Sequence, residues 1–450
     1  MAPDKTWAQE VCDRVSATHE TIKSVLTGMG YNVLDEAPLL RDYKDMEAAG
    51  RSLRARGINA LVIYTGTWTY ANCAVAAALE ADVPVVVLPD AEPGTCGLVG
   101  GAIARGGMGA YSIYANMVYG PIDQPQTRDK LKLYLDAACA AKGLRGQVLG
   151  LGGGRSMGMV TAVCDPNDFK MRFGIEVDSF EQMNVIAMAE TISDEKAYEF
   201  FDWIKQTYGE IVANEVAMIK QIKLYLAMVE FCRMMNYDFV AVKCLPELPA
   251  QYTTFCLAHA LLGDAMDAYG KKERFVFACE ADIMAALTMQ IMLMLTDLPV
   301  MFTDLTQYDF KSDVLTTCNC GSQPTDFAKD KKDVRWEIEG VHEFKWKYGG
   351  CCPQHVGKPG RVTMARISMD NGQYEMLIVP AEAVDMPREK LRETIWERPH
   401  TYFNLLCDKE DFFAGVRSNH IHVVYGEWEE HLAEVCRVLG IRPKILGSLS

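Results

Sequence analysis

The stretch from Arg274 to Asp304, RFVFACEADIMAALTMQIMLMLTDLPVMFTD, constrains the fold more than any other part of this chain. A short apolar run, a helix-length apolar segment and a second short apolar run predict a strand–helix–strand unit. Continuous apolar strands joined by a helix are typical of parallel sheets covered on both faces. The strands of such a unit end at one sheet edge, so we expect Glu280 and Asp304, at their ends, to face one crevice.

This pair of acids has two interpretations. Two carboxylates in one crevice repel each other unless a cation or a shared proton offsets their charge, which suggests a divalent-metal site. Alternatively, Glu280 and Asp304 are solvated acids that begin the next helix or turn, where acidic residues are favoured. Their spacing is compatible with both.

Composition and charge limit the class of protein. At 450 residues the chain is expected to form two or three domains. Its 49% hydrophobic and 23% charged residues are typical of a soluble globular protein. The net charge of -15 argues against a nucleic-acid partner and against an anionic membrane surface. No apolar signal segment is found in MAPDKTWAQEVCDRVSATHE, and the apolar window 283–294 is too short to cross a bilayer. We therefore expect a cytoplasmic protein without a membrane partner.

Cysteine usage is also informative. Fifteen cysteines in a chain without a leader predict reduced, mostly buried thiols. Cys318 with Cys320, and Cys351 with Cys352, raise the alternative of structural zinc, but neither pair has the CxxC spacing. Buried thiols are the preferred interpretation.

The pattern of apolar runs divides the chain into three parts. Runs such as NALVIYTG (59–66) and VPVVVLPD (83–90) alternate with helical segments, and a second alternating series begins at QVLGLGGG (147–154). After about residue 330, RVTMARISMD and QYEMLIVPAEAV alternate at period two, which predicts half-buried antiparallel strands. The predicted fold is α/β: two doubly wound α/β domains, residues 1–146 and 147–328, followed by a smaller antiparallel β-rich domain, residues 329–450.

Two further motifs carry polar chemistry. The glycine-rich run 150–154 follows a predicted strand, but a dinucleotide fingerprint would need glycine where Arg155 stands, which argues against a nicotinamide cofactor. Arg155 and Ser156 are either pocket residues or part of a tight turn. His420 and His422 are two apart, so on a strand they face the same side. One of them is a candidate metal ligand, although a histidine on a strand is more often a hydrogen-bonded core or surface residue.

The runs CEADIMAALTMQ, VMFTDLTQYD and CNCGSQPTDFA resemble the metal-binding core of the L-fucose isomerase family, which extends in fold to L-arabinose isomerases. The resemblance covers most of the chain through TWTYANCAVAAALEADVPVVVL, GGGRSMGM, VKCLPELPAQY, PGRVTMARIS and ERPHTYF. In that family a Glu, an Asp and a C-terminal His bind one Mn²⁺. The resemblance assigns them to Glu280, Asp304 and His420, the last in an Asn-His pair followed by Tyr-Gly. Cys320 stands where a serine is common, and His422 is an additional imidazole.

The resemblance implies a Mn²⁺-dependent aldose–ketose isomerase that acts on a free sugar similar to L-fucose or D-arabinose through a cis-enediol intermediate. Other divalent cations are possible. Glu280 and Asp304 would bind the metal and move protons as base and acid, with His420 mainly a ligand and His422 the next candidate base. Two alternatives remain: the same chemistry on an aldose with an anionic, for example sulfonated, C6 group, or a non-catalytic, two-lobed sugar-binding protein.

The remaining site predictions concern the sugar and the assembly. Candidate contacts to sugar hydroxyls or metal ligands are loop residues after predicted strands: Arg155, Ser156, Glu247, Gln251 and Asn419. The family resemblance implies a homo-oligomer, a hexamer or a trimer, in which Trp68 closes a neighbour's pocket. The alternative is a tryptophan packed within its own domain.

Overall fold

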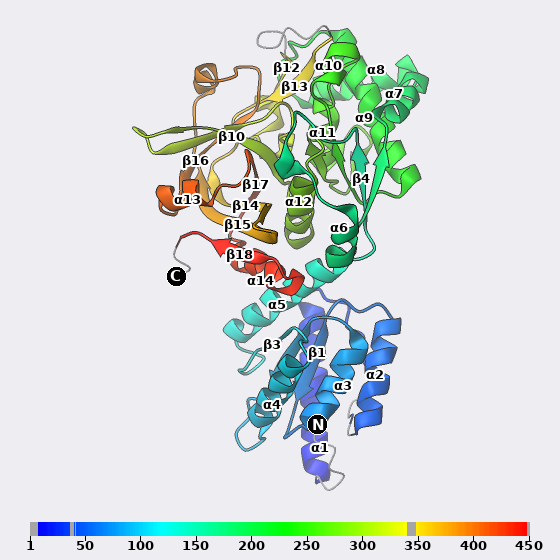
Figure 1. Cartoon of the computed structure of the whole chain (residues 1–450), viewed down its shortest axis with the longest axis vertical. Coiled ribbons are helices and arrows are strands. Elements are labelled where there is room, and N and C mark those ends of the chain that lie inside the picture. The colour runs from blue at the N-terminus through cyan, green and yellow to red at the C-terminus, as the bar shows by residue number, and fades with distance from the viewer. Residues whose placement is uncertain (1–7, 37–39, 41, 340–347, 448–450) are drawn as a thin grey trace. The chain divides into compact units, whose positions relative to one another are not determined.

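The computed structural model describes residues 8–36, 40, 42–339 and 348–447 (Figure 1). The chain forms two compact units, and the boundary between them falls between Gly143 and Leu144. Among the described residues, no helix combines the length and the apolar character needed to cross a membrane.

The first unit is a three-stranded parallel sheet, in the order β1-β2-β3, with helical connections. Its elements are α1 (Gln9–Gly28), α2 (Tyr43–Ala55), β1 (Leu61–Thr65), α3 (Ala71–Ala81), β2 (Val85–Pro89), α4 (Gly97–Ala110), β3 (Ala115–Met117) and α5 (Pro125–Gly143). Every residue of β2 is buried, because helices cover both faces of a parallel sheet.

The second unit begins with a four-stranded parallel sheet in the order β5-β4-β6-β9. Its strands are β4 (Val148–Gly152), β5 (Glu176–Phe180), β6 (Phe239–Val242) and β9 (Phe277–Cys279). The helices of this region are η1 (Val160–Ala162), α6 (Pro166–Phe173), α7 (Gln182–Thr191), α8 (Asp194–Thr207), α9 (Glu215–Met235), α10 (Glu247–Gln251), α11 (Cys256–Gly263) and α12 (Ile283–Thr296). A hairpin of β7 (Met266–Asp267) and β8 (Gly270–Lys271) precedes β9.

The rest of the second unit is a seven-stranded sheet in the order β14-β17-β10-β11-β16-β15-β18. Pairing of β14 with β15 closes it into a barrel-like ring, antiparallel except for β18. Its strands are β10 (Met301–Asp309), β11 (Val314–Cys318), β14 (Gly360–Asp370), β15 (Gln373–Ala383), β16 (His400–Leu405), β17 (His420–Tyr425) and β18 (Arg442–Ile445). The other elements are β12 (Arg335–Glu339), β13 (Gly350–Gln354), η2 (Thr325–Phe327), η3 (Lys331–Asp333), η4 (Arg388–Glu393), α13 (Lys409–Gly415) and α14 (Glu429–Leu439).

This architecture confirms the predicted fold class, an α/β chain with parallel sheets first and an antiparallel sheet towards the C-terminus. The division at residues 328/329 stays a prediction. The strands β10 and β11, which precede it, lie in one sheet with the C-terminal strands.

One prediction is wrong: residues 274–304 do not form a parallel strand–helix–strand unit, because β10 pairs antiparallel with β11 and β17 and not with β9. Helix α12 instead passes between the two sheets, in contact with β6 and β9 on one side and β14 and β17 on the other (Figure 1). A helix buried by two sheets is apolar all round, as the sequence of α12 is.

Candidate metal centre and active site

Glu280 reaches the site from the carboxyl end of β9. The backbone leaves the strand through two consecutive left-handed residues, Glu280 with φ 62° and Ala281 with φ 54°. Non-glycine residues pay about 1–3 kcal/mol for such conformations, which persist where the surrounding structure holds them and cluster at functional sites. The turn ends at Asp282, whose carboxylate caps α12 by accepting a hydrogen bond from Ala285 N at 2.9 Å.

Asp304 and His420 reach the same site from the barrel, where they lie directly opposite each other on the antiparallel strands β10 and β17. Opposed residues in such a pair have neighbouring side chains. His420 Nε2 lies 3.4 Å from Asp304 Oδ1 and 3.3 Å from Glu280 Oε2. The two sheets therefore bring together the three residues to which the resemblance assigned the metal.

The atoms that face one another here lack ordinary partners. Glu280 Oε2 and His420 Nε2 are buried and have no hydrogen-bond partner among the described residues. One ligand atom each from Glu280, Asp304 and His420 lies within 4.8 Å of the others. A buried polar atom without a partner costs free energy, which a cation at this point would offset. Two carboxylate oxygens and one imidazole nitrogen form a donor set that suits Mn²⁺ or a similar divalent ion.

Two asparagines hold the carboxylates in place. Asn319 Nδ2 donates to Glu280 Oε1 at 3.3 Å and also to Asp304 Oδ2, and Ser322 Oγ donates to Asn319 Oδ1 at 2.8 Å. Asn419 Nδ2 donates to Asp304 Oδ1 at 2.8 Å. The predicted contact Asn419 is thus beside the centre. Asn319 was not predicted, although it lies in the run CNCGSQPTDFA that carried the resemblance.

A buried ion pair between Asp282 and Arg366, which was also not predicted, orients the His420 ring. Its Nδ1 lies 2.7 Å from Asp282 Oδ2, and Arg366 donates to both oxygens of Asp282 at 2.8 and 3.2 Å. Burial alone would raise the pKa of Asp282, but Arg366 and His420 hold it well below its usual range. Burial alone would lower the pKa of His420, but Asp282, Glu280 and Asp304 raise it to about 9.

The pKa values of Asp304 and His422 are also shifted by their surroundings. Burial, together with the Glu280 carboxylate, raises the pKa of Asp304 although His420 opposes the shift. His422 Nε2 lies 3.4 Å from Arg366 Nη1, and burial, with the charge of Arg366, lowers the pKa of His422 well below its usual range.

The predicted loop residues that follow β4 and β6 lie at the edge of the parallel sheet where Glu280 lies, because β4, β6 and β9 are consecutive parallel strands of that sheet. Arg155 is exposed, whereas Ser156 is buried and donates to the carbonyl of Leu245 at 3.1 Å, which joins the loops after β4 and β6. Glu247 and Gln251 are exposed at the two ends of α10.

The surroundings of two predicted site residues, Glu247 and Trp68, bear on their roles. Glu247 pairs with Lys243 at 2.6 Å, and this contact lowers its pKa. Trp68 belongs to the first unit, in the segment that follows β1, and is 47% exposed.

The predicted thiols are also as expected. All fifteen cysteines, each within the described part of the chain, lie outside disulfides, and Cys318, Cys320, Cys351 and Cys352 are buried. The burial predicted for both pairs is thus confirmed.

Comparison with known proteins supports the family resemblance. The family model described as "L-fucose isomerase, C-terminal domain" matches residues 317–445, which include Asn319 and His420. A sulfoquinovose isomerase from Clostridium sp. (strain MSTE9) is 24% identical over 284 residues, which cover 61% of this chain and 59% of that protein. A sulfoquinovose isomerase from Alkalicoccus urumqiensis is 21% identical over 341 residues, 73% of each chain. The first alignment thus spans less than two thirds of that relative. The C-terminal match and the two relatives together support an L-fucose isomerase-like family of aldose–ketose isomerases.

Proposed function

We propose that this protein is a Mn²⁺-dependent aldose–ketose isomerase whose substrate is a free aldose with an anionic, sulfonated C6 group. The observation that carries the proposal is the convergence of Glu280, Asp304 and His420, with unpartnered buried atoms facing one another. The family match supports the isomerase class. Both relatives are sulfoquinovose isomerases, which supports the sulfonated sugar.

Isomerisation moves one proton between C1 and C2 of the sugar and another between O1 and O2. When bound by Glu280, Asp304 and His420, the metal supplies a Lewis acid that polarises the carbonyl and offsets charge on the enediol oxygens. The carboxylates approach the same point from different sheets. One of them can therefore take the proton from C2 and return it at C1, while the other moves the hydroxyl proton from O2 to O1, and a cis-enediol lies between the removal and the return.

The chain's own residues also define the surroundings of the sugar. Asn319 and Asn419 hold the two carboxylates through side-chain hydrogen bonds, which keep their oxygens directed at the substrate. Burial of Glu280 and His420 excludes water, which strengthens electrostatic interactions at the reacting carbons.

Arg155 is the group proposed to recognise the anionic end of the sugar. It is exposed, it follows β4 at the sheet edge that carries Glu280, and it forms no ion pair within the described ranges. A guanidinium binds a group with several anionic oxygens through charge-assisted hydrogen bonds. A neutral aldose similar to L-fucose or D-arabinose is the second candidate, favoured by the family description.

The proposal is tested with chelator-treated protein to which Mn²⁺ is returned. Sulfoquinovose, the matching neutral hexose, L-fucose and D-arabinose are each followed by NMR for ketose formation and for solvent deuterium entering the sugar. We expect ketose from the sulfonated hexose only when Mn²⁺ is present. Faster conversion of a neutral aldose would overturn the sulfonate assignment and leave the isomerase class standing. No conversion of any aldose by protein with bound Mn²⁺ would overturn both and favour a binding protein.

A further inference from the structure

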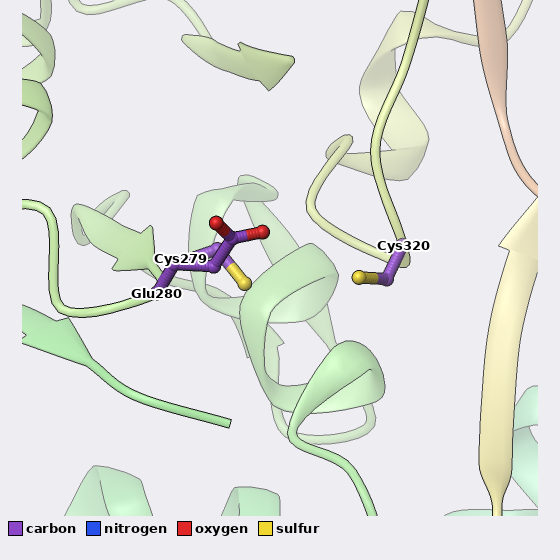
Figure 2. A group of neighbouring side chains, drawn as sticks. All are labelled: Cys279, Glu280 and Cys320. Carbon is purple, nitrogen blue, oxygen red and sulfur yellow. The ribbon is translucent and has the colours of Figure 1, made fainter. Parts of the chain in front are cut away.

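Glu280 belongs to a second group of potential metal ligands, which differs in chemistry from the first. The thiols of Cys279 and Cys320 and a carboxylate oxygen of Glu280 lie within 4.8 Å of one another. Figure 2 shows the Cys320 thiol directed towards Cys279, with the Glu280 carboxylate beside them. The Glu280 carboxylate is thus shared by two groups of potential ligands, one with oxygen and nitrogen donors and one with sulfur donors.

Local structure explains why these thiols meet. Cys279 is the last residue of β9 and directly precedes the left-handed turn at Glu280. Cys320 follows β11, one residue after Asn319, which holds Glu280 through a hydrogen bond. Cys256, the first residue of α11, interacts with Cys320 through a side-chain hydrogen bond.

The thiols line a small cavity that also contains an unpartnered imidazole. The cavity has a volume of about 10 Å³, and its lining includes Cys256, Cys279, Cys320 and His259. Such a volume is about that of one water-sized sphere. His259 is only 4% exposed, yet neither ring nitrogen has a hydrogen-bond partner among the described residues. The cavity thus combines room for a single ion with two thiols and an imidazole whose nitrogens lack hydrogen-bond partners among the described residues.

Sulfur and imidazole donors select a different cation from the one that suits Glu280, Asp304 and His420. Thiolate ligands favour Zn²⁺ and other thiophilic ions, whereas Mn²⁺ prefers oxygen and nitrogen. Binding through Cys279 and Cys320 as thiolates releases two protons to solvent, and the two thiolate charges offset the charge of the divalent ion.

We propose that Cys279, Cys320 and Glu280 form a second metal position for a thiophilic divalent cation such as Zn²⁺ or Cd²⁺, with His259 available from the cavity wall. Because both positions need Glu280, an ion at the thiols withdraws this carboxylate from Asp304 and His420. Occupation by the two classes of metal is then mutually exclusive, and the thiophilic ion is an inhibitor. This second part rests on the proposed function.

Cadmium alone is the probe for the thiol position. Full-length protein is stripped of metal, kept under a phosphine reductant and titrated with Cd²⁺ while the cadmium–thiolate charge-transfer absorption is recorded. We expect a tight step in the parent protein that Cys320→Ser loses. The loss should exceed the roughly 10–100-fold typical of a residue that only supports a ligand.

The matched control is Cys232→Ser, which removes an equally buried thiol from α9, outside the cavity, and should retain the step. Cys279→Ser provides a second test if Cys320→Ser does not fold, as judged by circular dichroism. Identical titrations of the parent and a folded Cys320→Ser or Cys279→Ser protein would overturn the proposal.

Competition is measured through the paramagnetic resonance signal of free Mn²⁺. One equivalent of Cd²⁺ should release Mn²⁺ from the parent protein but not from Cys320→Ser. Release that persists in Cys320→Ser would show that Cd²⁺ enters the first centre directly, and simultaneous binding of both ions would show that Glu280 is not exclusive. Either result would overturn the exclusion.

The two proposals fail separately. A cadmium step without isomerase activity on any aldose would remove the proposed function and leave the thiol position. Isomerase activity without a cadmium step would remove the thiol position and leave the proposed function.

Discussion

His420 Nδ1 lies 2.7 Å from Asp282 Oδ2, and both side chains are fully buried. The carboxylate accepts the hydrogen on Nδ1, so Nε2, which faces Glu280 and Asp304, is the ring nitrogen available to a metal. Arg366 neutralises Asp282 from the other side. This arrangement makes Asp282 a positioning residue for the histidine of the proposed metal centre, although Asp282 is not among the three potential ligands.

Asp282→Asn should therefore weaken Mn²⁺ binding by roughly 10–100-fold, the usual effect of losing the partner of a metal-binding histidine. It should also lower the free energy of unfolding by about 3–5 kcal/mol, because the charge of Arg366 remains buried without its partner. Calorimetric Mn²⁺ titration and denaturant unfolding measure the two effects, and saturating Mn²⁺ should restore most of kcat.

Asp326→Asn is the matched control for this change. Asp326 pairs with Arg274 and Lys331 elsewhere in the second unit, so its loss should reduce stability without changing Mn²⁺ affinity. Equal Mn²⁺ affinity in Asp282→Asn and the parent would refute the positioning role.

The ligands of the proposed centre should divide into two kinds. His420→Ala should lose metal affinity and regain part of its activity in excess Mn²⁺. Glu280→Gln and Asp304→Asn keep an oxygen donor but lose a basic carboxylate, which typically costs about 10²–10⁴-fold in rate. That loss, and the loss of proton exchange at C2, should persist at saturating Mn²⁺. If saturating Mn²⁺ fully restores the activity of both carboxamide variants, Glu280 and Asp304 only hold the metal, and His422 becomes the next candidate base.

Arg155→Gln should discriminate between sugars. A hydrogen bond to a charged group contributes about 1.5–3 kcal/mol, so kcat/KM for the sulfonated aldose should fall by roughly 10–150-fold. Turnover of a neutral aldose and Mn²⁺ content should change little. Arg172→Gln, which removes an exposed charge from α6, is the control and should affect neither sugar. An equal loss for both sugars would contradict the assigned role.

Acid should destabilise the second unit through its buried neutral histidines. Burial lowers the pKa of His355 from its ordinary 6.5 to about 3. Between these values the unfolded chain binds a proton that the folded protein does not. Stability is therefore fully present above the higher value and is lost as the pH falls, by about 2 kcal/mol for one such histidine near pH 5.

Denaturant unfolding of chelator-treated protein across this range measures the pH dependence. His355→Gln should show a smaller loss of stability in acid than the parent. His431→Gln, a change at a partly exposed histidine of α14, should keep the parent's pH dependence. A His355→Gln profile parallel to that of the parent would rule out this source of acid sensitivity.

Assembly is predicted from Trp68. We expect a homo-oligomer, a trimer or a hexamer, in which this tryptophan covers a neighbour's pocket, and its 47% exposure in the single chain leaves it available. Trp68→Ala should lower kcat/KM, whereas Tyr119→Ala, at a similarly exposed aromatic residue of the same unit, should not. Light scattering with activity assays decides, since a fully active monomer is incompatible with this role.

Local sequence was sufficient for the features that depend on short-range pattern. Apolar runs with helical connections predicted the parallel sheets, and period-two alternation predicted that β14 and β15 are antiparallel strands. Their predicted half-burial is wrong, because both strands are buried along most of their length. The family resemblance selected Glu280, Asp304 and His420, which do converge. These successes share a cause, because burial on one or both faces of a strand leaves its mark in adjacent residues.

Only the tertiary structure decided which strands pair and what supports the site. The first residues of β10 are apolar, which suits a strand in either sheet. Its pairing with β17, and not with β9, depends on long-range contacts that local periodicity does not record. Asp282 lies 84 residues from Arg366 and 138 from His420, and its sequence context marks it only as a helix cap. A charge becomes a support for a metal-binding histidine when folding buries it beside that ring, and this is a property of the assembled chain.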